Sequence, residues 1–291
     1  MPLTHTRTFR VRFGECDAYG HVSNINYVRY MQEAAFEASA AGGYDFARYQ
    51  TLGQYWLARE TQVDYLKPLV YGDTFEVKTW VADFRRVRSR RAYEFRKTGE
   101  GELAARATTD WVYIDNATQR PVTVPPDMIA AFWPEGAPPP AEPREPFPPR
   151  PPEPAAIFTQ RRPVIWRDID TAWHVNNTVY VQYADDCGMA VLDAYGWPVR
   201  RMIAAGFGIF VRRNRIEYVQ PAVLGDEVDV STWVYGRQRA TATRYYSMTR
   251  ASDGARLAQI HAFCVWVNPA TGQPVRIPAD FWADFTPNAA A

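Results

Sequence analysis

The stretch that decides the fold is ECDAYGHVSNINYVRY, residues 15–30, because it returns as DIDTAWHVNNTVYVQY at residues 168–183. A shift of 153 residues relates the two stretches, and it aligns Asp17 with Asp170, His21 with His174, Asn24 with Asn177, Tyr27 with Tyr180 and Tyr30 with Tyr183. The same shift, without a gap, aligns Tyr65 with Tyr218, Pro68 with Pro221, Gly72-Asp73 with Gly225-Asp226 and Trp80 with Trp233. A period this long indicates two copies of a whole domain and not a solenoid.

The length of 291 residues agrees with two domains of ordinary size. Between the copies, Pro134–Pro154 reads PEGAPPPAEPREPFPPRPPEP, and eleven of these 21 residues are proline. Such a composition favours an extended, semi-rigid segment. We therefore expect one domain at residues 1–133, a linker at 134–155 and a second domain at 156–291. A ligand for an SH3-type module is the alternative interpretation of the proline-rich segment.

Each copy predicts the same order of elements. A short strand is expected at Thr8–Phe13 and at Val164–Trp166, followed by the polar loop and a helix. The apolar faces of the two helices are expected to consist of Tyr27, Tyr30, Met31, Ala34 and Ala38, and of Tyr180, Tyr183, Ala184, Cys187 and Val191. Three or four strands follow, of which residues 75–81 and 228–234 alternate clearly, with hairpin turns at Gly99-Glu100-Gly101 and Asp253-Gly254. A helix followed by a run of long strands predicts an α+β fold with the sheet wrapped over one helix.

Composition excludes several classes of protein. The formal net charge is +1, which argues against a sequence-independent nucleic-acid binder. Apolar residues make up 47% of the chain, enough for a large core, yet no apolar run is long enough for a membrane span. Cys16, Cys187 and Cys264 are far apart in sequence, which favours free thiols in a reducing cytoplasm and gives no metal-ligand spacing.

The polar loop is the candidate for chemistry. Asp17, His21 and Asn24 come just before the expected helix, as do Asp170 and His174 in the second copy. A helix N-terminus offers N–H groups and a positive dipole end that can hold an oxyanion, and a nearby carboxylate can act as base or nucleophile. The alternative is structural, because Asp and Asn also cap helices and a loop histidine often only bonds to backbone.

These motifs resemble those of tandem hotdog-fold thioesterases over the whole chain apart from the linker and tails. The residues on which the resemblance rests are Asp17-x-x-Gly20-His21-Val22-x-Asn24-x-x-Tyr27 and Trp166-x-Asp168-Ile169-Asp170-x-x-x-His174-Val175-Asn176-Asn177-x-x-Tyr180. The first copy is similar to the 4-hydroxybenzoyl-CoA thioesterase group, and the second to the second half of plant acyl-carrier-protein thioesterases. The resemblance implies two fused hotdog domains, each an antiparallel sheet around a long helix. It also implies that they form an intrachain pseudo-dimer with active sites at the interface of the copies.

The resemblance also implies roles for single residues. Asp17 matches the aspartate that attacks the thioester or activates water, with the carbonyl oxygen held by backbone N–H groups near Gly20 to Val22. In this interpretation His21 and Asn24 orient water or the loop. The matching positions of the second copy are Asp170, His174 and Asn177. There, however, Ala172 and Trp173 replace the expected Asn and Gly, whereas the first copy lacks only the second Asn of the doublet, at Ser23. We therefore expect Asp17 to be the main catalyst.

Other charged or reactive residues have two interpretations each. Arg85, Arg86, Arg88, Arg90 and Arg91 form a cluster that is expected either to bind the phosphates of CoA or to be a solvated hairpin. Cys16 is expected to pack and not to act as a nucleophile, because Ile169 takes its place in the second copy. Glu33 and Asp186 occupy equivalent helix positions and are expected to be solvated helix charges.

The leading functional hypothesis is hydrolysis of an acyl- or aroyl-CoA thioester to the free acid and CoA. It needs no cofactor or metal, since CoA enters as part of the substrate. The alternatives are an acyl-carrier-protein thioesterase, an enoyl-thioester hydratase or dehydratase, and a non-catalytic acyl-CoA-binding protein. The expected partners are acyl-CoA or an acyl carrier protein, with no nucleic acid and no membrane span. A monomer or a homo-oligomer of double-hotdog units is feasible.

Overall fold

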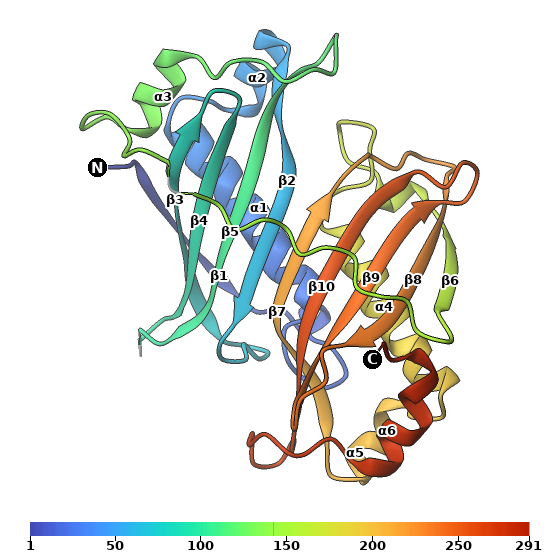
Figure 1. Cartoon of the computed structure of the whole chain (residues 1–291). Helices are drawn as coiled ribbons and strands as arrows, with labels where there is room; N and C mark the ends of the chain where they lie inside the picture. The colour runs from blue at the N-terminus through green and yellow to red at the C-terminus, as the bar shows by residue number, and fades with distance from the viewer. Residues whose placement is uncertain (100, 142, 291) are drawn as a thin grey trace. The chain divides into compact units, whose positions relative to one another are not determined.

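The computed structural model describes residues 1–99, 101–141 and 143–290 and divides into two compact units, Met1–Pro146 and Phe147–Ala291. Both units repeat one order of elements (Figure 1). The elements of unit 1 are β1 (Thr4–Arg10), α1 (Asn24–Ala41), α2 (Phe46–Leu52), β2 (Gln54–Tyr65), β3 (Thr74–Arg85), β4 (Arg88–Lys97), β5 (Leu103–Asp115) and α3 (Pro126–Phe132). Those of unit 2 are β6 (Phe158–Pro163), α4 (Val179–Ala194), α5 (Val199–Ala204), β7 (Gly208–Tyr218), β8 (Glu227–Tyr235), β9 (Thr241–Arg250), β10 (Arg256–Val267) and α6 (Ala279–Phe285).

Each unit contains an antiparallel sheet that curves around its long helix (Figure 1). In unit 1 the strand order is β1-β3-β4-β5-β2, and in unit 2 it is β6-β8-β9-β10-β7. The aligned positions of the two copies therefore occupy the same places in the two sheets. This confirms the predicted pair of tandem hotdog domains.

The buried face of each long helix is the one that the sequence predicts. All five residues expected on the inner face of α1 are buried, and so are all five expected on α4. Aromatic rings take part in these contacts, because Tyr30 meets Phe75 of β3 edge-on at 4.9 Å and Tyr27 meets Phe95 of β4 at 5.4 Å between ring centroids. Residues 75–81 alternate between buried and more exposed positions, as a sheet with one face on a helix requires.

The predicted first strands are wrong in position. The strands are Thr4–Arg10 and Phe158–Pro163, whereas Phe13 and Trp166 lie in short 3-10 helices that follow them. β1 pairs with β3 from Thr4 to Arg10, and its inward side chains include His5 and Arg7, which bond to Glu37 on α1. The apolar alternation of this strand is therefore incomplete, because His5 and Arg7 make polar contacts on the inner face, whereas Phe9 on the same face packs on Tyr30 and Phe75.

The predicted hairpin turns lie where β4 joins β5 and where β9 joins β10. Gly254 has a φ of +71°, the left-handed conformation that a glycine adopts without strain, and this confirms the second turn. Gly99 and Gly101 also have positive φ, but Glu100 between them lies outside the described residues. Glu142 of the proline-rich segment and Ala291 lie outside them as well.

The proline-rich segment is docked on both units. In unit 1, Arg144 donates to Asp83 at 2.6 Å and lies 3.3 Å from Asp110, which also forms a bidentate pair with Arg90. Both aspartates are only 7% exposed, so the segment completes a buried ion-pair cluster. In unit 2, Arg150 lies over the ring of Trp233 at 4.9 Å. Arg144 and Arg150 therefore attach the described part of the segment to the folded units.

Within the described ranges, no helix is both long enough and apolar enough to cross a bilayer.

His261 in β10 lies beneath the first residues of unit 2. The ring of Phe147 meets it edge-on at 5.3 Å, and the Tyr235 hydroxyl lies 2.7 Å from its Nδ1 atom. Burial lowers the pKa of His261 to about 4; the carbonyl of Pro148 acts in the opposite direction, and the charge of Arg215 lowers the pKa further. Between about pH 4 and pH 6.5, His261 is therefore neutral in the folded chain and protonated in the unfolded chain.

We expect this histidine to make the unfolding free energy of unit 2 depend on pH. Because the pKa is lower in the folded state, its contribution is complete above the ordinary value of 6.5 and is lost as the pH falls toward about 4. The loss amounts to about 3 kcal/mol over this range. Urea denaturation of the wild type and His261→Gln between pH 7 and 4 measures it. An equally steep pH dependence in both proteins contradicts the assignment.

Candidate active site

The polar loop of unit 1 is fastened to α1 by a carboxylate. Oε2 of Glu15 accepts the hydroxyl of Tyr30 at 2.6 Å and the backbone N–H of Arg12 at 2.7 Å. Burial and the bond to Glu15 together raise the pKa of Tyr30, so its hydroxyl stays a donor. In unit 2, Asp168 accepts the Tyr183 hydroxyl at 2.8 Å and the Ile165 N–H at 3.1 Å. Sequence reasoning placed both tyrosines on an apolar face and missed these anchors, although the acid–tyrosine spacing is the same in both copies.

The other end of each loop is fastened to the segment between the second and third strands of its unit. The N–H of Val22 donates to the Leu69 carbonyl at 2.8 Å, and the N–H of Val175 donates to the Ala222 carbonyl at 2.9 Å. The hydroxyl of Tyr180 also accepts the N–H of Ala222 at 3.0 Å. The loop is therefore held between the long helix and this segment.

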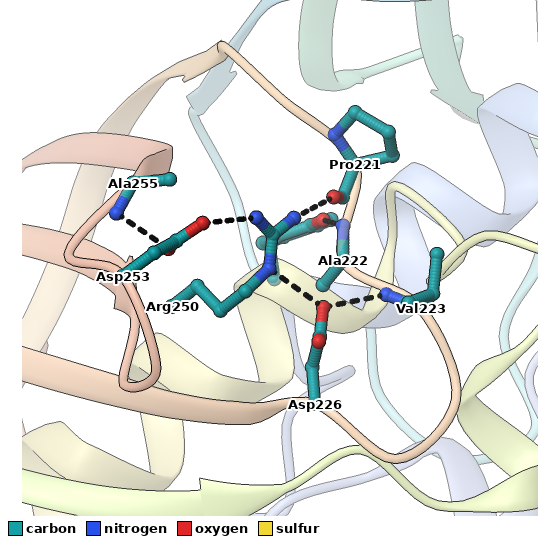
Figure 2. A network of polar contacts seen from close by, with 8 residues as sticks. Pro221, Ala222, Val223, Asp226, Arg250, Asp253 and Ala255 are labelled. Carbon is teal, nitrogen blue, oxygen red and sulfur yellow. Dashed lines mark hydrogen bonds and ion pairs between the residues drawn. The ribbon is translucent and has the colours of Figure 1, made fainter.

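The repeated Gly-Asp pair keeps that segment in place. Asp73 and Asp226 each accept a backbone N–H three residues earlier and a charged side chain from a neighbouring strand. Figure 2 shows the unit 2 network, in which Arg250 donates to Asp226, to Asp253 and to the carbonyl of Pro221. The repeated set of Pro, Gly and Asp positions thus supports the segment on which the loop is held.

Asp17 lies at the exposed tip of the unit 1 loop. Its Oδ1 accepts the N–H groups of Tyr19 at 2.9 Å and His21 at 3.2 Å, which fixes the orientation of the carboxylate. Within the described residues, Asp17 is exposed and its Oδ2 has no hydrogen-bond partner. One oxygen therefore holds the loop and the other is available for a substrate or a water molecule.

Asp170 of unit 2 is more fully occupied. Its Oδ1 accepts the N–H of Ala172 at 2.9 Å, and its Oδ2 accepts the side-chain amide of Asn176 at 3.2 Å. Ser23 takes the place of Asn176 in unit 1 and donates to the carbonyl of Glu15 instead. The missing second Asn of the first copy therefore leaves its aspartate open.

The tip of both loops has the same backbone conformation. Gly20 has a φ of +80° and Trp173 a φ of +62°, so the second copy places a bulky residue in the left-handed region. Such a conformation costs a non-glycine residue about 1 kcal/mol. Trp173 is exposed and its ring meets that of Trp166 edge-on at 6.1 Å. The substitution therefore changes the surface of the loop without changing its backbone.

The backbone N–H groups expected to hold an oxyanion are engaged in this conformation. Gly20 donates to the carbonyl of Asp17 at 3.0 Å and Val22 to that of Leu69 at 2.8 Å. At the start of α1, by contrast, Ser23 is the N-cap residue and its side chain does not cap the helix. In that first turn the N–H of Asn26 donates to the carbonyl of Ser23 at 3.0 Å, and the start of the helix presents the positive end of its dipole to a developing negative charge.

The other predicted site residues lie at or just before the start of the long helix of each unit. His21 and Asn24 are half-buried, the former before α1 and the latter as its first residue. In unit 2, His174 and Asn177 are half-buried before α4. Within the described chain, Nδ1 of His174 is buried without a hydrogen-bond partner.

The arginine cluster is not near Asp17 within unit 1. It lies at the β3–β4 hairpin, whereas the loop contacts Leu69 and Val70 ahead of β3, and the twelve residues of β3 span about 36 Å. Arg90 is paired with Asp110, and Arg91 is buried against Phe132. The exposed members are Arg85, Arg86 and Arg88.

The other reactive side chains have structural surroundings. The pKa of the Cys16 thiol is raised by burial and by Asp17, so the thiol is not activated as a nucleophile. Glu33 pairs with Arg7, and Asp186 pairs with Arg162, each on the neighbouring edge strand. Cys16, Cys187 and Cys264 are free thiols. Among the residues that the structure describes, no group of three or more acidic, cysteine or histidine side chains is arranged to hold a metal ion.

Comparison with known proteins finds one family twice. The model of the thioesterase-like superfamily matches residues 11–132 and again residues 164–285, at the same spacing as the internal repeat.

Among the relatives, an Aquifex aeolicus protein provisionally named an esterase is 30% identical over 129 residues, which are 44% of this chain and 96% of that protein. YneP of Bacillus subtilis, provisionally named an acyl-CoA thioesterase, is 26% identical over 116 residues, or 40% of this chain and 83% of YneP. The 12:0-ACP thioesterase from Umbellularia californica has the same fold, with a TM-score of 0.71 and 19% identity over 91% of this chain and 98% of that one.

We expect Tyr30→Phe to loosen the loop and to lower the unfolding free energy of unit 1. The change removes a hydrogen bond to a charged carboxylate, a loss of about 1–3 kcal/mol. Urea denaturation measures it, and Tyr71→Phe is the control because the Tyr71 side chain is 62% exposed. Equal stability of Tyr30→Phe and Tyr71→Phe contradicts the anchoring role.

Proposed function

We propose, because this chain belongs to the thioesterase-like superfamily, that it hydrolyses an acyl- or aroyl-CoA thioester to the free acid and CoA. The observation that carries the proposal is the carboxylate of Asp17, which is oriented through Oδ1 and open at Oδ2. A carboxylate in this arrangement can serve as base or nucleophile without losing its own support. The similarity to YneP, which is provisionally named an acyl-CoA thioesterase, supports a CoA-linked substrate.

In the general-base form of the reaction, Asp17 takes a proton from a water molecule as that water adds to the thioester carbonyl. The carbonyl oxygen becomes an oxyanion, which we assign to the first turn of α1. That turn lies at the positive end of the dipole of an 18-residue helix. The carbon–sulfur bond then breaks, and the proton on Asp17 passes to the departing thiolate. His21 supports this step by fixing Asp17 through its backbone N–H.

The two copies are proposed to contribute unequally. Asp170 carries the same acid in the same loop, but Asn176 occupies the oxygen that is open in Asp17. Removing the charge of Asp170 therefore has a smaller effect on turnover than removing that of Asp17. The difference follows from one side chain, because the loop backbone is the same in both units.

We expect Asp17→Asn to lower kcat/KM for acyl-CoA hydrolysis by about 10²–10⁴-fold, the usual range for loss of a general base. Asp170→Asn is the matched variant and is expected to change kcat/KM less than tenfold. Release of free CoA, followed with a thiol reagent over a panel of aliphatic and aryl acyl-CoAs, gives the rates. No turnover by the wild type, or full turnover by the double variant, overturns the proposal.

The same assay, extended to crotonyl-CoA and to acyl-carrier-protein thioesters, separates the other functions that the fold permits. Loss of enoyl absorbance from crotonyl-CoA without release of thiol identifies a hydratase. Tight binding of acyl-CoA without turnover identifies a binding protein. Turnover of carrier-linked but not CoA-linked thioesters identifies an acyl-carrier-protein thioesterase.

A further inference from the structure

A surface pocket of about 520 Å³ lies at the free edge of the unit 1 sheet. Its wall follows β1 into the 3-10 helix at Phe13–Glu15 and is completed by Tyr30 of α1 and by Tyr71. Glu15 precedes Asp17 by two residues, so the pocket adjoins the loop that carries the proposed catalyst. The arginine cluster at the β3–β4 hairpin lies at the far end of β3 and takes no part in this wall.

The pocket has a positive charge that its own surroundings do not neutralise. Of its three arginines, Arg7 is paired with Glu33 and Glu37 on α1. Arg10 and Arg12 are exposed, and among the residues that the structure describes neither forms an ion pair. The one carboxylate in the wall, Glu15, is already bonded to the Tyr30 hydroxyl and the Arg12 N–H. Two guanidinium groups are thus available to an anion, and arginine matches phosphate geometry well.

Two exposed aromatic rings stand at the same pocket. Phe13 is 81% exposed and Tyr71 is 62% exposed, and their rings meet edge-on at 5.8 Å. Large aromatic side chains left this open at a pocket offer a face on which a planar base can stack. Cations beside exposed rings fit a ligand that carries both phosphates and a nucleobase.

The second copy does not repeat these features. The shift of 153 residues places Pro163, Ile165 and Leu224 where unit 1 has Arg10, Arg12 and Tyr71. Of the arginine and aromatic positions at the pocket mouth, only that of Phe13 keeps an aromatic ring, as Trp166. The two copies therefore share the loop and its anchors, whereas Arg10 and Arg12, which have no ion pair within the described residues, belong to the copy whose aspartate is open.

We propose that this pocket binds the adenosine 3′-phosphate 5′-diphosphate end of a CoA thioester. Arg10 and Arg12 hold the phosphates, and the adenine stacks against Phe13 and Tyr71. The inference rests on the proposed function for the reaction at Asp17, but binding of the nucleotide does not depend on turnover. It deepens that function by assigning CoA, and not a carrier protein, as the group that the unit 1 surface recognises.

The test is a calorimetric titration of the full chain with adenosine 3′,5′-bisphosphate, which carries the base and phosphates but no thioester. We expect the wild type to bind, and Arg10→Gln combined with Arg12→Gln to weaken binding by about tenfold or more. The matched control is Arg86→Gln combined with Arg88→Gln, two exposed arginines of the β3–β4 hairpin, which should leave the affinity unchanged. No binding by the wild type, or an equal loss in the control, overturns the proposal.

Kinetics with substrates of different carriers give the second readout. The Arg10/Arg12 double variant should raise KM for an acyl-CoA by about tenfold, leave kcat unchanged, and leave hydrolysis of the N-acetylcysteamine thioester unchanged because that substrate has no nucleotide. Weaker hydrolysis of an acyl-carrier-protein thioester with unchanged nucleotide binding assigns the arginines to a carrier protein and overturns the proposal. If the wild type hydrolyses no thioester, the proposed function fails, and the titration still decides whether the nucleotide binds.

Discussion

The structure of each unit depends on a hydrogen bond from a buried helix tyrosine to a carboxylate at the start of the loop. Tyr30 donates to Glu15 in unit 1 and Tyr183 donates to Asp168 in unit 2. The bond fixes where the chain leaves the edge strand relative to the long helix. The N–H of Val22 then fixes the other end of the loop on the carbonyl of Leu69. A short loop clamped at both ends can expose a carboxylate at its tip without becoming disordered.

The hydrogen bonds at both ends of the loop also explain why its tip accepts either a glycine or a tryptophan. Trp173 adopts nearly the same left-handed conformation as Gly20, although a side chain makes that conformation unfavourable by about 1 kcal/mol. The anchors on both sides together outweigh this cost, so the backbone of the tip follows from its surroundings and not from its own residue. The side chains around the tip are then free to diverge, which is how Ser23 and Asn176 come to give their aspartates different environments.

The features that the sequence predicts well are those with a periodic apolar signal or an internal repeat. The inner faces of α1 and α4 follow from helical spacing, and the domain pair follows from the shift of 153 residues. β1 was misplaced because its inner face carries His5 and Arg7, whose partners on α1 come from far along the chain. Whether the second carboxylate oxygen is bonded depends on the side chain six residues later, which is Ser23 in unit 1 and Asn176 in unit 2. Asn176 points to its aspartate and Ser23 to the carbonyl of Glu15, and the sequence does not give these directions. The proline composition likewise predicts an extended segment but not the aspartates that receive Arg144.

The docking of the proline-rich segment bears on how the two halves can be separated. Along the chain, the boundary between the two units falls between Pro146 and Phe147, inside the segment. Each unit therefore includes part of the segment. A first half cut at Trp133 leaves Asp83 and Asp110 without the guanidinium of Arg144, and a second half begun at Ala156 uncovers His261 and Trp233. The two copies of the duplicated domain are therefore not interchangeable. Each copy has its own part of the proline-rich segment packed on its surface.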